Sequence, residues 1–261
     1  MRRLRLSERV GQGTIAANRM RFKSAGMIQD LLMLPGLNCD ARLWRDVVAG
    51  LGARARCLVA DLRGPDSVAG MAAQALAGAP PRFALAGLSM GGYVAMEIMR
   101  LAPERVTRLA LLDTSARADD AARTQARMTA IALVEQGKFG LVARTPQPGL
   151  LAPQHLGTAL ADDVADMAER AGARAYLGHQ KAIMARIDSR PSLAAINVPT
   201  LVGVGEADGV TPPELAEEMA RLIPGARLVV FPGCAHMSTM EAPDAVTAAM
   251  AEWLEAQGAR H

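Results

Sequence analysis

Cysteine and lysine are scarce in this 261-residue chain, and no apolar run is long enough to cross a bilayer. The three cysteines, Cys39, Cys57 and Cys234, are too few and too widely spaced for a disulfide framework or a zinc site. We therefore expect reduced thiols, no bound metal, no membrane partner and a cytoplasmic location.

The formal net charge of +3 is concentrated at the N-terminus. Residues 1–25 hold seven arginines and lysines but one glutamate, so the rest of the chain has a net charge of −3. This mildly acidic body has no basic stripe for a phosphate backbone, which argues against a nucleic-acid partner. We expect residues 1–25 to form a basic, disordered extension, because termini are commonly solvated. A start codon assigned too early, with the real start at Met20 or Met27, is an alternative interpretation.

Short apolar runs alternate with helical patterns over the first 112 residues and again after residue 199. Runs of this length that are apolar throughout favour a sheet covered on both faces. Strand–helix alternation predicts an α/β fold with a doubly wound, mostly parallel sheet. The predicted strands are 31–34, 56–60, 83–86, 106–112, 200–204 and 227–231. The predicted helices are 41–51, a short one after Ser67, 90–101, one opened by a capping box at 211–214 and reaching about residue 222, and 243–257.

The alternation stops between residues 115 and 190, where no strand is predicted. Stretches 119–135, 154–160 and 162–187 have helical patterns instead, and the breaker run 145–149 separates the first from the others. We therefore predict one α/β core, formed by residues 26–115 and 191–261, with a helical cap at residues 116–190 inserted into it.

The segment Gly87-Leu88-Ser89-Met90-Gly91 lies between a predicted strand and a predicted helix. A serine on such a strand-to-helix turn is held in strained backbone geometry, with its Oγ exposed above the sheet. Small residues two positions before and after it are needed because the turn brings neighbouring backbone close. The helix that follows offers oriented N–H groups to a developing oxyanion. This context favours Ser89 as a nucleophile over a serine that only caps the helix.

A general base for this serine is predicted at His236, one of four histidines in the chain. His236 follows the last predicted strand, in a loop of glycine and small residues at the carboxyl edge of the sheet. His155 and His179 lie in the predicted cap, where polar surface or pocket lining is the default interpretation, and His261 is the terminal residue.

The base needs a carboxylate that fixes its tautomer and stabilises the imidazolium. Asp208 directly follows the strand predicted at 200–204, so it lies at the same carboxyl edge as the serine turn and is our candidate. Asp113, at the end of strand 106–112, is a rival because an acid there could also reach the histidine. Glu206 is a second rival, and its ordinary interpretation is a solvated loop charge.

The oxyanion of an attacked carbonyl needs two N–H donors. One follows the nucleophile, at Met90. The other is expected in the loop after the first strand, where Pro35 and Gly36 let the backbone turn sharply and aim the N–H of Leu37 at the pocket. Losing one such donor typically costs about 2.7–4 kcal/mol of transition-state stabilisation.

Taken together, these motifs resemble the α/β-hydrolase superfamily over residues 28–256, and small bacterial carboxylesterases and lactonases in particular. The segments that carry the resemblance are 34–37, 87–92, 205–208 and 233–236, in the order Ser, Asp, His. The resemblance implies a Ser89–Asp208–His236 triad, an acyl-enzyme intermediate and no cofactor. Two departures are the Pro35-Gly36 pair, where many members have His-Gly, and a weak strand pattern at 14–25, which would leave the sheet a strand or two short.

We therefore expect a small-molecule substrate with a carboxylic ester, thioester or lactone group. An enol-lactonase, a C–C bond hydrolase or a perhydrolase using the same three residues is the runner-up within enzymes. A non-catalytic binding module of the same fold is the alternative outside enzymes. The sequence predicts neither the oligomeric state nor the physiological substrate.

Overall fold

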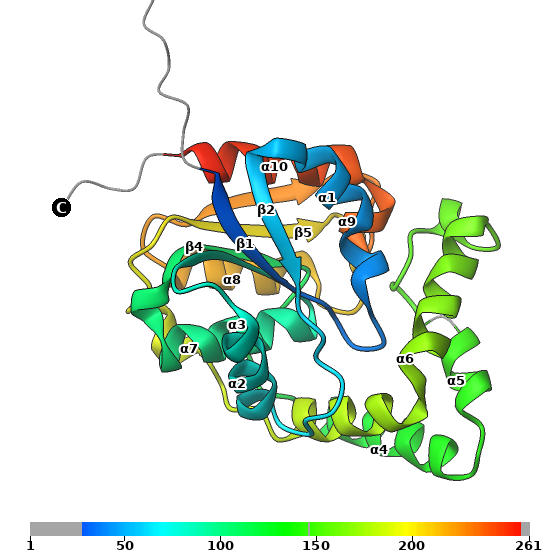
Figure 1. Ribbon diagram of the computed structural model, residues 1–261. Coiled ribbons are helices and arrows are strands. Elements are labelled where there is room, and N and C mark those ends of the chain that lie inside the picture. Colours follow the sequence, from blue (N-terminus) through cyan, green and yellow to red (C-terminus); the bar gives the residue numbers. More distant parts are fainter. Residues whose placement is uncertain (1–27, 146, 257–261) are drawn as a thin grey trace, which may run out of the picture.

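The computed structural model describes residues 28–145 and 147–256, so the predicted N-terminal extension lies outside the described residues. Six strands form one sheet in which all neighbouring strands are parallel, in the order β2-β1-β3-β4-β5-β6 (Figure 1). They are β1 (Gln29–Leu34), β2 (Ala55–Val59), β3 (Phe83–Leu88), β4 (Val106–Leu112), β5 (Thr200–Gly205) and β6 (Arg227–Phe231). The α/β, doubly wound parallel fold predicted from the sequence is confirmed.

Helices cover both faces of this sheet, on opposite sides in Figure 1. One face packs against α2 (Val68–Gly78), α3 (Met90–Leu101) and α8 (Pro213–Leu222), and the other against α1 (Arg45–Leu51), α9 (Ser238–Glu241) and α10 (Pro243–Glu255). Alternate residues of β1 pack against the two helical layers. Leu32 and Leu34 contact the layer of α2, α3 and α8, whereas Leu31 and Met33 contact the layer of α1, α9 and α10. All four side chains are at most 1% exposed. This two-sided burial explains why β1, β3 and β5 are apolar over most of their length.

Between β4 and β5 the chain leaves the sheet and forms α4 (Ala121–Glu135), α5 (Phe139–Arg144), α6 (Ala159–Met184) and α7 (Arg190–Leu193). Helices α4, α5 and α6 lie together beyond the carboxyl ends of the strands (Figure 1). Helix α6 bends at Gly172, whose φ of 84° and ψ of 159° are not helical. No helix among the described residues is both long and apolar enough to span a membrane.

Several predicted helices differ in detail from the observed ones. Residues 41–44 form a 3-10 turn that leads into α1, and the helix expected at 154–160 is only a 3-10 turn, Pro153–His155. Helix α5 was not predicted. The capping box expected at 211–214 is also absent, because α8 begins at Pro213 and the Thr211 hydroxyl bonds to Asp208 instead of to the helix.

The strand order places the switch point of the sheet between β1 and β3. From β1 the chain winds to β2 on one side, whereas β3 to β6 follow on the other. In open α/β sheets, ligands bind at the carboxyl ends of the strands beside such a switch point. Ser89 follows β3 and Leu37 follows β1, so both lie at this edge of the sheet.

Candidate active site

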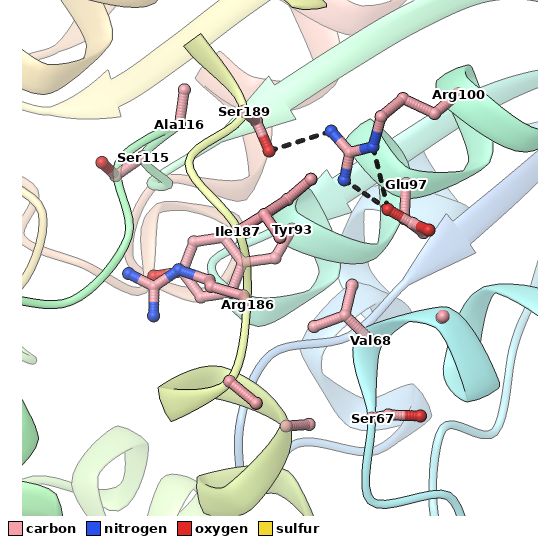
Figure 2. Close-up of a pocket in the computed structure, with 13 residues that line it drawn as sticks. Ser67, Val68, Tyr93, Glu97, Arg100, Ser115, Ala116, Arg186, Ile187 and Ser189 are labelled. Carbon is pink, nitrogen blue, oxygen red and sulfur yellow. Dashed lines mark hydrogen bonds and ion pairs between the residues drawn. The ribbon is translucent and has the colours of Figure 1, made fainter. Parts of the chain in front are cut away.

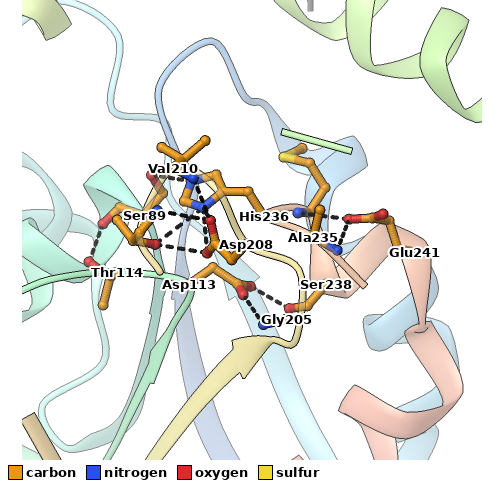
Figure 3. Close-up of polar contacts among 12 residues, drawn as sticks. Ser89, Asp113, Thr114, Gly205, Asp208, Val210, Ala235, His236, Ser238 and Glu241 are labelled. Carbon is orange, nitrogen blue, oxygen red and sulfur yellow. Dashed lines mark hydrogen bonds and ion pairs between the residues drawn. The ribbon is translucent and has the colours of Figure 1, made fainter. Parts of the chain in front are cut away.

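Ser89 occupies the turn between β3 and α3 in a strained conformation, with φ of 54° and ψ of −117°. The turn is fixed on both sides of the serine: its N–H donates to Leu112 O at 3.0 Å, and its carbonyl accepts from the Thr114 hydroxyl at 2.7 Å. A non-glycine residue with positive φ persists only where its surroundings hold it. The contacts to β4 supply that support and leave the hydroxyl directed above the sheet (Figure 3).

Glycine is required at both positions that flank the turn. A Cβ on Gly87 would lie 2.3 Å from the carbonyl oxygen of Gly91, and a Cβ on Gly91 would lie 2.1 Å from the carbonyl oxygen of Leu34. Both neighbours are backbone atoms, which cannot rotate away as a side chain could. The motif therefore has glycine at these two positions because the backbone of the turn lies against Gly87 and the backbone of β1 lies against Gly91.

His236 lies beside the serine hydroxyl, with its Nε2 2.9 Å from Ser89 Oγ. On its other side, Nδ1 is 2.8 Å from Asp208 Oδ2. Because an ionised carboxylate only accepts hydrogen bonds, Nδ1 carries the ring proton and Nε2 keeps its lone pair toward the serine. The imidazole thus has the tautomer that accepts a proton from the hydroxyl, and its side chain is only 4% exposed.

Asp208 is buried, and four donors satisfy its carboxylate. Its Oδ1 accepts the N–H groups of Val210 and Thr211, both at 2.8 Å. Its Oδ2 accepts the Thr211 hydroxyl at 2.8 Å as well as the ring N–H of His236 (Figure 3). A buried carboxylate is stable only with such a set of partners. The loop after β5 therefore holds the carboxylate of Asp208 in one orientation toward the histidine.

The electrostatics of His236 follow from this contact. Burial lowers its pKa, but the charge of Asp208 and the hydrogen bond to it act in the opposite direction and outweigh burial, so the pKa is raised above the usual value. The site therefore stabilises the imidazolium that forms when the serine loses its proton.

The loop after β1 lies directly against the serine. A Cβ on Gly36 would be 3.4 Å from the Cβ of Ser89, and the amide of Cys39 closes a turn onto Gly36 O at 3.2 Å. Leu37 is in this turn and Met90 is the first residue of α3. No hydrogen bond joins either N–H to another residue in the described part of the chain. Within the described residues, both N–H groups thus remain free to donate.

The other candidate side chains lie in different environments. Asp113 does not contact the imidazole: its carboxyl group bonds to Gly205 and Ser238. Glu206 accepts the N–H of Gly233 at 3.0 Å at an exposed position. His179 is buried on α6, where burial lowers its pKa and its Nε2 lies 3.2 Å from Leu62 O. His155 is in the 3-10 turn Pro153–His155, and His261 lies outside the described residues.

Glu241 on α9 is a part of the site that sequence reasoning missed. Its Oε1 accepts the N–H groups of Ala235 and Met237, which flank His236, each at 3.1 Å. Its Oε2 accepts the N–H of Ala152, in the segment between α5 and α6, at 2.8 Å. One carboxylate therefore fixes the loop of the histidine and joins it to the inserted helical region. The only signal in the sequence was an acidic residue five positions after His236.

The segment that precedes α6 is attached to the same loops. Gly149 O accepts the N–H of Gly209 at 3.2 Å, and Leu150 O accepts the N–H of His236 at 3.2 Å. Further along, the Gln154 amide donates to Gly233 O at 2.6 Å. These contacts fix residues 149–154 against the loops that carry Asp208 and His236.

Two cavities lie near the carboxyl edge of the sheet. One, of about 410 Å³, is bordered by Pro35 and Cys39 of the β1 loop and by Arg63 and Arg170. The other, of about 190 Å³, lies between α2, α3 and the end of α6, where Arg186 covers the ring of Tyr93 (Figure 2). Neither is lined by Ser89, Asp208 or His236. Residues 28–145 and 147–256 contain no cluster of three or more acidic, histidine or cysteine side chains that could hold a metal ion.

Comparison with known proteins agrees with this architecture. The model of the Alpha/beta hydrolase family matches residues 31–249. The chain belongs to this family. A pimeloyl-[acyl-carrier protein] methyl ester esterase of Edwardsiella ictaluri is 28% identical to the hydrolase and covers 87% of it, and the match covers 93% of that esterase.

Solved structures show the same fold over nearly the whole hydrolase. A thermophilic esterase from Thermogutta terrifontis, solved with malate bound, superposes with a TM-score of 0.81 and 32% identity, covering 87% of this chain and 89% of the other. The enol-lactonase from Burkholderia xenovorans superposes with a TM-score of 0.80, covering 90% and 94% of the two chains. Because the enol-lactonase is only 24% identical to this chain, its similarity shows the fold alone.

Proposed function

We propose that this hydrolase cleaves carboxylic esters by two-step acyl transfer, with Ser89 as nucleophile, His236 as general base and Asp208 as the carboxylate that orients the base. The observation that carries the proposal is the continuous relay from Ser89 Oγ through the imidazole to Asp208, with contacts of 2.9 and 2.8 Å. The relay joins three loops that are far apart in the sequence, and its tautomer is the one that activates a hydroxyl.

In the first step the Ser89 oxygen attacks the carbonyl carbon while its proton moves to His236 Nε2. The N–H groups of Leu37 and Met90 stabilise the resulting oxyanion. His236 then gives the proton to the leaving alcohol, and the acyl group stays on the serine. In the second step a water molecule gives a proton to His236 and attacks the acyl-enzyme, and His236 then returns the proton to Ser89 Oγ as the carboxylic acid leaves.

The substrate is a small molecule with an ester, thioester or lactone carbonyl. Two relatives are named as esterases, and both match most of the chain. We propose that residues 116–190 act as a cap on the core formed by 26–115 and 191–261, and that this cap bounds the substrate pocket. The contacts of residues 149–154 with the loops of Asp208 and His236 support this division.

The proposal is tested by replacing Ser89 with Ala and measuring hydrolysis of p-nitrophenyl acetate. We expect S89A to fold as the wild type does and to lose turnover by a factor on the order of 10⁴ or more. Ser192→Ala, on α7, is the matched control and should keep full activity, because its hydroxyl bonds to Ser189 O and to Arg100 and to no residue of the proposed triad. Turnover retained in S89A would overturn the assignment.

A further inference from the structure

The carboxyl group of Asp113 is a buried polar group that the proposed reaction leaves unused. It follows β4, is 0% exposed and has a positive φ of 44°. An L-residue other than glycine rarely adopts this conformation, so the surrounding structure must hold Asp113 there. The N–H of Asp113 donates to Gly203 O at 2.8 Å. The next residue, Thr114, donates its hydroxyl to the carbonyl of Ser89.

Asp113 connects the loop of the acid to the loop of the base. Its Oδ1 accepts the N–H of Gly205, the last residue of β5, three positions before Asp208, at 2.9 Å. Its Oδ2 bonds to the hydroxyl of Ser238, the first residue of α9, two positions after His236. Figure 3 shows the carboxyl group directed at both partners, below Asp208. This side chain therefore bridges the two loops beside the Asp208–His236 contact, and the bond from Ala207 N–H to Cys234 O, at 2.8 Å, joins them as well.

The environment of Asp113, taken as a whole, opposes the ionisation of its carboxyl group. Asp208 and His236 face it from the loops after β5 and β6, and Glu241 on α9 and Cys234 lie in the same cluster. No arginine or lysine pairs with Asp113 among the residues that the structure describes. Burial, and then the charge of Asp208, raise the pKa of Asp113 to about 8, although His236, Ser238 and Gly205 act in the other direction.

We propose that Asp113 is a positioning residue of the catalytic site that works as a neutral carboxylic acid, fastening the loop of His236 to the loop of Asp208. The inference rests on the proposed function, since it assigns the residue to the same reaction. In the neutral form the carboxyl group keeps both contacts: Oδ1 accepts from Gly205 N–H, and Oδ2 pairs with the Ser238 hydroxyl. The imidazole then has Asp208 as the one carboxylate to which it is hydrogen-bonded.

The first test compares D113N with D208N. Asparagine has the shape and the donor–acceptor pattern of a neutral aspartic acid, and it tolerates positive φ. We expect D113N to keep kcat/KM at pH 7 within about threefold of the wild type, whereas D208N loses on the order of 10⁴-fold.

We also expect the pH profile of kcat/KM to change slope near pH 8 in the wild type, where Asp113 ionises, and to lack that change in D113N. A loss in D113N as large as in D208N would overturn the inference, whereas full activity in D208N would overturn the proposed function.

A second readout is independent of activity. The pKa of Asp113 is near the ordinary aspartate value of 3.8 in the unfolded chain and about 8 in the fold, so between these values the folded state binds more protons and its stability falls as pH rises. D113N lacks this penalty. The Tm of the wild type relative to D113N should therefore fall steadily from pH 5 to pH 8 and then level off. A constant difference over that range would show an ionised carboxylate and contradict the inference.

Should D113N fail to fold, the wild-type protein still provides a test. In protein labelled with ¹³C at the aspartate carboxyl carbon, we expect one aspartate to titrate near pH 8, and S238A should shift that titration because Ser238 bonds directly to Asp113. If every aspartate titrates below pH 6, the inference is wrong.

Discussion

At the scale of single residues, the site is held by side chains that touch the proposed triad without reacting. Asp208 receives two backbone N–H groups and the Thr211 hydroxyl, and Glu241 receives the N–H groups on both sides of His236. A reacting geometry is productive only within a fraction of an ångström, so groups of this kind matter for the rate as well as for stability.

Thr211 gives the sharpest test of this support. T211V removes the hydroxyl that donates to Asp208 Oδ2 but keeps the shape of the side chain, whereas T211S keeps the hydroxyl. A hydrogen bond to a charged group contributes about 1.5–3 kcal/mol, so we expect kcat/KM of T211V to fall by roughly 10- to 100-fold and that of T211S to stay near wild type. Equal activity of T211V and the wild type in p-nitrophenyl acetate hydrolysis would contradict this role.

How far the sequence predicts the site depends on what each residue contacts. Ser89, Asp208 and His236 are recognisable because each follows a strand that is marked by its own apolar run. Thr211 was misread as a helix cap, because the local pattern Thr-Pro-Pro-Glu fits a capping box as well as a loop. Glu241 bonds to Ala152, 89 positions earlier in the chain, and no local pattern signals such a contact.

At the scale of elements, the strands are predictable because parallel strands buried on both faces are short apolar runs. The inserted helices are less predictable. Helix α5 has only six residues, which is too short for a helical period to be recognised, and α6 changes direction at Gly172 in the middle of a continuous helical pattern. What bends α6 is the conformation of one glycine, which the hydrophobic pattern does not record.

Gly172 and Gly140 form a matched pair for testing the bend. An added Cβ meets no atom within 4 Å at either position, but only Gly172 has a positive φ. We expect G172A to lose about 1–3 kcal/mol of stability through backbone strain. G140A, inside α5, should gain about 0.5–1 kcal/mol through helix propensity. Thermal denaturation distinguishes the two, and a destabilised G140A beside an unchanged G172A would refute the argument.

At the scale of the whole molecule, the inserted helices are tied to the sheet where the chain leaves and returns. Ser189 N–H donates to Ala116 O at 2.7 Å, and the Arg186 guanidinium donates to Arg117 O. Asp119, with a side chain 1% exposed, pairs with Arg186 at 2.8 Å and with Arg127 at 2.6 Å. These ion pairs link the first and last turns of the insertion.

Removing the charge of Asp119 should therefore weaken the whole fold. D119N leaves two guanidinium groups without their carboxylate, one of them buried, and breaking a buried pair from one side costs about 3–5 kcal/mol. We expect Tm to fall by roughly 10 °C. Asp166→Asn removes an exposed pair with Arg144 and is the control, for which we expect a change of less than about 1 kcal/mol. Similar Tm values for the two variants would show that the pairs at Asp119 contribute little.

The central claim, that Ser89 is the nucleophile of this hydrolase, is tested most directly by labelling with a fluorophosphonate and mapping the modified peptide by mass spectrometry. The account predicts one adduct per chain, located on Ser89, that is absent in S89A and forms much more slowly when His236 is replaced by Ala. An unlabelled wild-type protein, or an adduct on a different residue, would contradict it.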